Sequence, residues 1–187
     1  YNRQYGKKRW KAPTVISLAI GQDALVVSPI QKANMCAAIA NRGYYFTPHV
    51  VRKIGGKALT DSSYTVAKHT SIEEKHFKTI IKGMEKVYTS NHGTAKNARV
   101  KNIEICGKTG TAENPHGEDH SIFIAFAPKR KPQIAIAVYV ENGGWGSTWA
   151  APIASLMIEQ YLTGQVNNTE RENFILSGNL MDKQNEK

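Results

Sequence analysis

Apolar residues recur at helical spacing in the segment that begins at Ser28, and this pattern predicts an amphipathic helix. Ser28 can cap the helix, Pro29 suits its first turn, and Gln31 is placed to complete a capping box with Ser28. One apolar face continues to Ala40, and Gly43 is the residue type that commonly ends a helix. We therefore expect a helix that opens at Ser28 and stops before Gly43.

A second amphipathic helix is predicted from Ser71, because Ser71-Ile72-Glu73-Glu74 has the form of a capping box. The turn-forming residues Asn91-His92-Gly93 mark the end of this region. Between them, apolar residues recur at three- and four-residue spacing and predict a buried stripe: Phe77, Ile80, Ile81, Met84, Val87 and Tyr88.

Two other segments precede and separate these helices. Thr14–Val27 is mostly apolar and contains Gly21-Gln22-Asp23, which predicts a turn between two buried stretches. Tyr44–Val51 is aromatic and β-branched around Pro48, which predicts an extended segment.

Three strand candidates follow one another in the second half of the chain. They are Ile103–Ala112, Ser121–Ala127 and Gln133–Val140, and the last two are joined by the short segment Pro128–Pro132. Short connections cannot cross over between parallel strands. We therefore expect an antiparallel meander of three strands.

A terminal helix is predicted from about Trp149 to Leu162, closed by Gly164. From Gln165 onward the chain is rich in Asn and Glu, which predicts a loosely held polar tail over 165–187. Helices, then a meander, then a helix indicate the α+β class, with helices packed on an antiparallel sheet. Residues 1–164 would form the folded part.

The composition is that of one globular domain, with 41% hydrophobic and 21% charged residues in a chain of 187. The longest apolar runs, such as Ile134–Val140, are too short for a transmembrane helix, and no signal peptide is visible at the beginning. Cys36 and Cys106 each lie in an apolar stretch and are expected to be small core residues.

The chain is basic, with 25 Lys and Arg against 15 Asp and Glu and a net charge of +10. Such a charge is compatible with nucleic acid, anionic lipid or an acidic polymer as partner, or with solubility alone. No helix-turn-helix or aromatic–glycine RNA-binding signature accompanies it, so we expect no nucleic-acid partner. The cluster Lys129–Lys131 is expected to be a solvated hairpin tip.

The most informative motif is Lys108-Thr109-Gly110-Thr111, which lies inside the first predicted strand. Alternation places Lys108 and Gly110 on one face and the two threonines on the other. A glycine within a strand often marks a close approach by another backbone or a ligand. An ammonium, a hydroxyl and a bare backbone together suit an extended peptide that carries a carboxylate, although an ordinary strand with an exposed lysine has the same pattern.

Two other motifs carry less weight. His116 and His120 have the spacing of helical metal ligands, but Pro115 and Gly117 argue against a helix there, so we expect a polar loop and no metal. Gly143–Gly146 stands between a strand and a helix and predicts a tight turn rather than a phosphate-binding loop. Nothing in the sequence indicates a cofactor.

Lys-Thr-Gly is one of three elements of penicillin-binding proteins and serine β-lactamases. The chain resembles the C-terminal half of a penicillin-binding protein transpeptidase domain, of the monofunctional class B, penicillin-binding protein 2 type. The resemblance covers most of residues 14–164. It rests on four groups of residues in the family's order: Ala19–Gln22 with Ser28–Asn34 and Ala37–Gly43, Lys108–Glu113, His120–Pro128, and Glu141–Gly144.

This resemblance implies a partial β-lactamase-like fold and roles for four residues. Lys108 and Thr109 would bind the carboxylate of a stem peptide or of a β-lactam, and Gly110 would leave room beside the strand. The backbone N–H of Thr111 would be one of two oxyanion-hole donors. The family reaction is acyl transfer through a serine acyl-enzyme, without cofactor. The resemblance also implies a membrane-anchored parent protein on the periplasmic face of the bacterial inner membrane, in a cell-wall elongation complex.

The family's other two elements are not found in these residues. No Ser-x-x-Lys occurs; Thr65–Lys68 and Thr79–Lys82 have its spacing with Thr in place of Ser. The one Ser-x-Asn, Ser177–Asn179, follows the Lys-Thr-Gly instead of preceding it, so we interpret it as chance. Asp23 stands where related sequences usually have Gly. A turn tolerates Asp at such a position, because Asp can adopt the left-handed conformation.

We therefore expect these residues to be a piece of a longer enzyme, inactive without its N-terminal half. Two alternatives stay open. One is a non-catalytic basic module that binds an anionic polymer, and the other is a β-lactam sensor or a β-lactamase with the same Lys-Thr-Gly strand. The preceding sequence, with or without a Ser-x-x-Lys, would separate them.

Overall fold

A three-stranded antiparallel sheet forms the centre of the molecule. The computed structural model describes residues 6–7, 11–22 and 25–180. The strands are β5 (Cys106–Ala112), β6 (His120–Ala127) and β7 (Ile134–Val140), in the order β5-β6-β7. This is the meander that the three apolar segments and their short connections predict, and the α+β class is confirmed.

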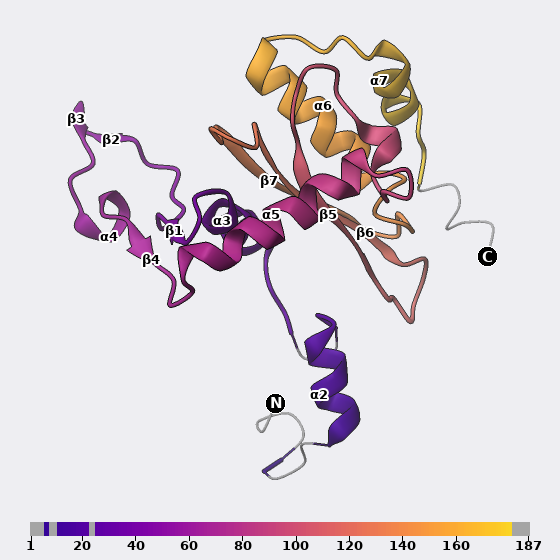
Figure 1. The fold of residues 1–187 in the computed structure, drawn as a ribbon, viewed down its shortest axis with the longest axis horizontal. Helices are drawn as coiled ribbons and strands as arrows, with labels where there is room; N and C mark the ends of the chain where they lie inside the picture. Colours follow the sequence, from indigo (N-terminus) through magenta and orange to yellow (C-terminus); the bar gives the residue numbers. More distant parts are fainter. Residues whose placement is uncertain (1–5, 8–10, 23–24, 181–187) are drawn as a thin grey trace.

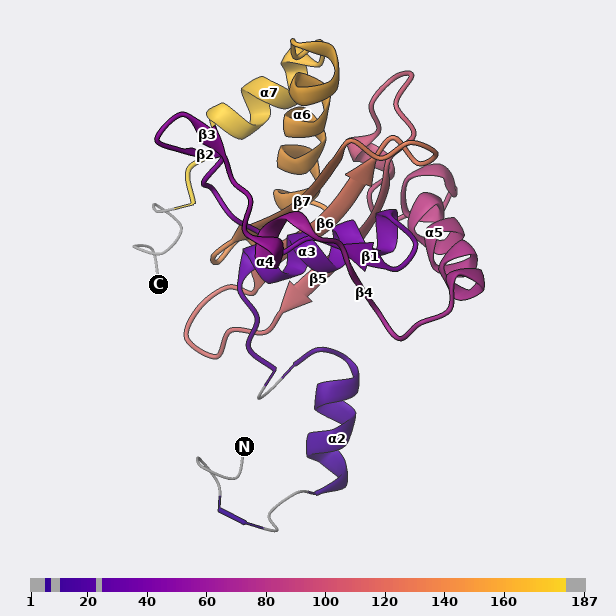
Figure 2. The same cartoon turned by 90° about the vertical axis from the view of Figure 1, so that its left-hand side faces the viewer.

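Helices cover both faces of this sheet and one side of it (Figure 2). Helix α6 (Ala150–Thr163) packs on β6 and β7 from one face, and α3 (Pro29–Ala40) packs on the same two strands from the other. Helix α5 (Glu74–Thr89) runs along β5. The sheet is therefore the middle layer of the fold, with β5 at its edge.

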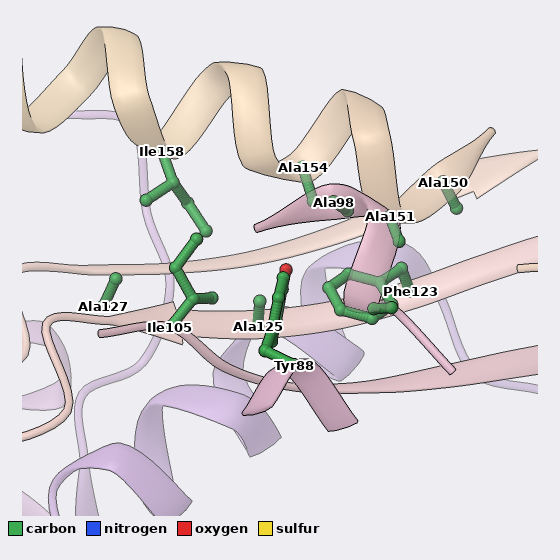
Figure 3. Packing of buried hydrophobic residues seen from close by; sticks show 11 residues of the cluster. Tyr88, Ala98, Ile105, Phe123, Ala125, Ala127, Ala150, Ala151, Ala154 and Ile158 are labelled. Atoms are coloured by element: carbon green, nitrogen blue, oxygen red, sulfur yellow. The ribbon is translucent and has the colours of Figure 1, made fainter. Parts of the chain in front are cut away.

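Strand β6 supplies the core on both sides, because successive side chains of a strand point to opposite faces. Phe123 and Ala125 pack with Tyr88 and with Ala154 and Ile158 of α6 (Figure 3). The small side chains of α6 let its backbone approach the sheet closely. On the other face, Phe126 packs with residues of α3, α5 and β5: Cys36, Ala40, Phe77, Ile81, Met84 and Cys106.

The helix-end signals at two positions are confirmed. Ser28 and Gln31 form the capping box of α3, and the Ser28 backbone N–H donates to the Gln31 side chain at 2.8 Å. Gly164 ends α6 in the left-handed conformation, with φ of 80°. Both signals involve residues within one turn of each other, so sequence alone locates them.

The predicted start of α5 at Ser71 is wrong, since the helix begins at Glu74 with Glu73 at its N-cap. The two-residue strands β1 (Tyr44–Tyr45) and β4 (Lys68–His69) pair antiparallel just before it. The Thr70 N–H also donates to the Gly43 carbonyl at 2.8 Å. This pairing keeps the chain extended up to Thr70, so the helix forms later than the local pattern predicts.

The segment 44–69 forms a small lobe beside the helices (Figure 1). After β1 it contains a hairpin of β2 (Lys53–Ile54) and β3 (Lys57–Ala58), followed by the short helix α4 (Ser62–Thr65). Only the first two residues of the predicted extended segment Tyr44–Val51 are strand. Pro48 cannot donate to a ladder, which agrees with the irregular backbone around it.

The apolar N-terminal segment is not buried as predicted. Helix α2 (Ala12–Ala19) has no buried residue and lies apart from the sheet (Figure 1). Ile16 is 64% exposed, and Val26 beyond the turn is 89% exposed. Asp23 of the predicted turn lies outside the described residues. The apolar pattern marks a surface suited to burial, but no described part of the chain covers it.

The segment after Gly164 is more ordered than a loose tail. It contains helix α7 (Thr169–Leu176), whose N-terminus is capped by the Asn168 side chain, and α7 packs on α6. The Phe174 ring stacks on Trp149 with centroids 5.2 Å apart. A predicted loose tail is therefore wrong for residues 169–176, whereas 181–187 lie outside the described residues. The boundary at residue 164 stays a prediction.

None of the helices among the described residues has the length and apolar character needed to cross a membrane.

The two buried thiols make stability depend on alkaline pH. Burial raises the pKa of Cys36 and of Cys106 from 9.0 to about 12. Between these two pKa values a thiol ionises in the unfolded chain but stays protonated in the folded chain. The free energy of unfolding therefore has its full value below pH 9 and decreases as the pH rises above 9. In the pH range where both thiols are ionised only in the unfolded chain, we expect the free energy of unfolding to decrease by about 3 kcal/mol per pH unit.

Urea unfolding under reducing conditions, at pH values from 8 to 11, measures this slope. The Cys36→Ala/Cys106→Ala double variant is the control, because it removes both thiols while other groups still titrate. A double variant that loses stability as steeply as the original chain would contradict the assignment.

Candidate active site

The Lys-Thr-Gly motif lies in the middle of β5, at the edge of the sheet. Lys108 is opposite Ile124 and Gly110 is opposite Ile122, whereas Thr109 is opposite Phe123. Phe123 belongs to the core under α6, so the threonines point to that side and Lys108 and Gly110 to the other. The alternation predicted from the sequence is confirmed.

A groove of about 430 Å³ runs along this part of β5. Its walls come from β5 and β6, from α3, and from the segment that precedes α3. All four residues of the motif line it together with Ile122 and Ile124, and the opposite wall contains Ile20, Gly21, Gln22, Leu25, Val27, Gln31, Lys32 and Met35. The groove is therefore mostly apolar, with two lysines in its lining.

The two lysines are held in different ways. Lys108 is exposed, and its ammonium donates to the Thr109 carbonyl at 2.7 Å. Lys32 projects from α3, and its Nζ lies 5.5 Å from the centroid of the Tyr139 ring. Partial burial lowers the pKa of Lys32. Together they give an otherwise apolar groove positive charge that attracts an anion.

Gly110 leaves room on the groove side of the strand. A Cβ built at Gly110 would be 3.4 Å from the Ile122 Cβ, which is an ordinary contact distance. Backbone geometry thus permits a side chain here. The glycine keeps the strand bare where a ligand would lie along it.

The turn Gly143–Gly146 supports the motif from behind. A Cβ at Gly146 would lie 2.5 Å from the Gly110 carbonyl oxygen and 2.4 Å from that of Ile122, so only glycine fits. The Ser121 hydroxyl donates to the Trp145 carbonyl at 2.9 Å and accepts from the Ala150 N–H at 3.2 Å. The sequence predicts the tight turn, but its contact with Gly110 joins residues 36 positions apart and has no local signal.

The Thr109 hydroxyl has a partner that no local sequence pattern indicates. Its oxygen lies 2.9 Å from the hydroxyl oxygen of Thr94, in the turn after α5. Lys32 was missed as well. A lysine inside the predicted helix at Ser28 is unremarkable in sequence, and only the packing of α3 beside β5 brings it to the groove.

The weaker sequence motifs do not reach the groove. His120 accepts from the Asn142 N–H at 3.1 Å and packs on Tyr139, and no group of three potential metal ligands occurs among the described residues. Lys68 donates to the Thr47 hydroxyl at 2.7 Å. Ser177 caps the C-terminal end of α7, and its hydroxyl donates to the Phe174 carbonyl, which agrees with a chance match.

Comparison with known proteins gives one consistent result. The model of the penicillin binding protein transpeptidase domain matches residues 2–159. The peptidoglycan D,D-transpeptidase MrdA of Haemophilus influenzae is 30% identical, over 91% of this chain and 30% of its own length. The chain thus spans about a third of such relatives.

Solved structures agree with this assignment. Penicillin-binding protein 2 of Pseudomonas aeruginosa superposes with a TM-score of 0.77 and 32% identity, over 90% of this chain and 37% of that one. The imipenem acyl-enzyme of penicillin-binding protein A from Mycobacterium tuberculosis superposes with a TM-score of 0.69 and 30% identity, over 82% of this chain and 35% of that one. With a central sheet, a Lys-Thr-Gly edge strand and these relatives in agreement, the chain belongs to the penicillin-binding protein transpeptidase domain family.

Proposed function

We propose that the protein containing this chain is a peptidoglycan D,D-transpeptidase and a covalent target of β-lactams. The observation that carries the proposal is the groove along β5, where Lys108, Thr109, Gly110 and Thr111 lie together at a sheet edge. An edge strand can pair with an extended peptide, and the adjacent lysine supplies charge for a terminal carboxylate. This combination suits a stem peptide that ends in a carboxylate.

The four motif residues divide the work of binding and transition-state stabilisation. Lys108 and the Thr109 hydroxyl bind the carboxylate, Gly110 leaves space for the peptide backbone, and the Thr111 N–H donates to the oxyanion of the tetrahedral intermediate. The serine nucleophile and its lysine base come from a part of the protein outside these 187 residues. Attack forms the acyl-enzyme and expels the terminal residue, and an amine of a second strand then resolves it.

Further properties of the whole protein follow from this reaction. Its substrates are stem peptides of peptidoglycan, which is built outside the inner membrane, so we propose that it acts on the periplasmic face of that membrane, anchored there by another segment. Cross-linking requires newly made strands, which supports a place in a cell-wall elongation complex. The alternative of a non-catalytic basic module predicts no acylation of the full-length protein at all.

Replacement of Lys108 tests the carboxylate-binding role. In the full-length protein, Lys108→Ala should slow acylation by benzylpenicillin about 10- to 100-fold, as expected for loss of a charge-assisted contact. The melting temperature should stay unchanged, because the Lys108 side chain is exposed and contributes little packing.

Acylation is followed by stopped-flow or by intact-protein mass spectrometry at short times. Lys131→Ala is the matched control, since Lys131 is an exposed lysine at the hairpin tip away from the groove. An acylation rate of Lys108→Ala within twofold of that of the original protein would show that Lys108 does not bind the carboxylate.

A further inference from the structure

Thr109, which lines the groove, and Thr94, which lies beside it, form a pair of hydroxyls on the α6 side of β5. Their oxygens are 2.9 Å apart, and either can be the donor. Thr94 lies 15 residues earlier in the chain, between α5 and the 3-10 helix η1 (Lys96–Ala98). Among the described residues, the Thr109 hydroxyl has no other side-chain partner.

A bound carboxylate would settle the direction of this hydrogen bond. Each hydroxyl has one proton and can also accept, whereas an ionised carboxylate only accepts. If Thr109 donates its one proton to the carboxylate, Thr94 must be the donor in the hydrogen bond between the two threonines. The three groups then form one chain from Thr94 through Thr109 to the carboxylate, and each donor in such a chain polarises the next.

The backbone around Thr94 is held in place by α5. A Cβ at Gly93 would lie 2.4 Å from the Val87 carbonyl oxygen, so the chain can pass this helix end only with glycine. The Ala95 N–H donates to the same carbonyl at 3.0 Å, and the side chains of Ala95 and Ala98 are fully buried. Thr94 thus stands between two anchored residues.

The C-terminal helix α7 contacts the segment that follows Thr94. One guanidinium nitrogen of Arg171 donates to the Asn97 carbonyl at 3.0 Å and to the Arg99 carbonyl at 2.8 Å. The Asn97 side chain donates in turn to the Ser147 carbonyl at 3.3 Å. The bonds of Arg171 connect residues more than 70 positions apart, and they hold η1 and Arg99, a few residues after Thr94, against a segment whose sequence resembles a tail.

From these contacts we infer that Thr94 is a positioning residue for carboxylate recognition, and that Arg171 of α7 supports it by holding the segment that follows Thr94 in place. Thr94 donates to Thr109 and leaves the Thr109 proton for the substrate. The inference rests on the proposed function, because it assigns Thr109 to the carboxylate. Its specific consequence is that loss of the Thr94 hydroxyl slows acylation only by ligands that carry a carboxylate.

The test compares benzylpenicillin with its methyl ester as acylating agents of the full-length protein. Thr94→Val removes the hydroxyl at nearly constant shape and should slow acylation by benzylpenicillin about fivefold, the effect of one hydrogen bond. The rate with the ester should change less than about twofold, a difference below half a kcal/mol. Thr94→Ser keeps the hydroxyl and should restore the rate with benzylpenicillin.

Two control variants accompany these measurements. Thr89→Val makes the same chemical change in α5, where the hydroxyl donates to the Glu85 carbonyl instead, and should leave both rates unchanged. Arg171→Met should reproduce the slower reaction with benzylpenicillin and spare the ester. Arg130→Met, at the exposed hairpin tip, should affect neither.

Equal slowing of both ligands by Thr94→Val, or no slowing of either, would overturn the positioning role. An Arg171→Met protein without the carboxylate-dependent loss would overturn the part assigned to α7. The proposed function is tested separately by Lys108→Ala. If that variant discriminates between acid and ester but Thr94→Val does not, this inference fails and the proposed function stands.

Discussion

A chain of these 187 residues incubated with excess benzylpenicillin should gain no penicilloyl mass. In the proposed function the groove supplies recognition and one oxyanion donor, but covalent catalysis also needs a nucleophile with a base beside it. None of the serines has a lysine three positions later. Stabilisation of the oxyanion lowers the barrier to an attack but cannot replace the attacking group.

The two threonines with the required spacing are engaged or misplaced in the structure. The Thr65 hydroxyl donates to the Asp61 carbonyl at 2.9 Å, and Lys68 donates to Thr47 rather than approaching Thr65. Thr79 lies on an exposed part of α5 and does not line the groove. Neither hydroxyl is therefore activated or close to a bound β-lactam.

Intact-protein mass spectrometry after incubation decides the matter. The full-length protein is the positive control and should gain one β-lactam mass under the same conditions. A stoichiometric adduct on the 187-residue chain, mapped to any Ser or Thr by digestion, would show that the nucleophile lies within it.

Replacement of Gly107 by alanine should destabilise the domain strongly. A Cβ at Gly107 would lie 2.5 Å from Cζ of Phe123 and 2.9 Å from the Ile124 carbonyl oxygen. Phe123 is fully buried and cannot move aside without opening the core under α6. Overpacking of this kind costs about 1–3 kcal/mol or more. At this chain length, each kcal/mol lowers the melting temperature by about 2–4 °C.

Gly110→Ala is the matched control, three residues along the same strand. Its new methyl group would meet only Ile122 at ordinary contact distances, so the melting temperature should stay within about 1–2 °C of the original, a change below half a kcal/mol. The methyl group enters the groove, however, and should slow acylation of the full-length protein. Thermal unfolding followed by circular dichroism separates the two variants, and equal melting temperatures would contradict the packing argument.

Local signals were sufficient for much of the fold. The capping box of Ser28 and Gln31, the stop at Gly164 and the three-strand meander all depend on residues within a few positions of each other, or on connections too short for another topology. The faces of β5 follow from the same kind of local pattern, the alternation of side chains along a strand. The strand that carries Lys108 and its division into two sides were therefore predictable from the sequence alone.

The family resemblance predicts the motif residues themselves but not the contacts that hold them in place. It selected Lys108, Thr109, Gly110 and Thr111 by their order in the chain. Lys32 in the opposite wall, Thr94 beside Thr109 and Gly146 behind Gly110 come from other elements. Nothing within a few residues of any of them signals the groove.

The sequence by itself determined the periods, the caps and the motif, and tertiary structure decided everything that depends on a distant partner. The β1–β4 pairing delays the start of α5 to Glu74, and the contacts of Arg171 and Phe174 turn a polar tail into a packed helix. An apolar pattern such as that of α2 states that a surface is suited to burial, but not what buries it. Hydrophobic contacts and hydrogen bonds form between residues that are close in space even when they are far apart in the sequence. Sequence patterns, in contrast, can be recognised only among the few residues that share a turn or a strand.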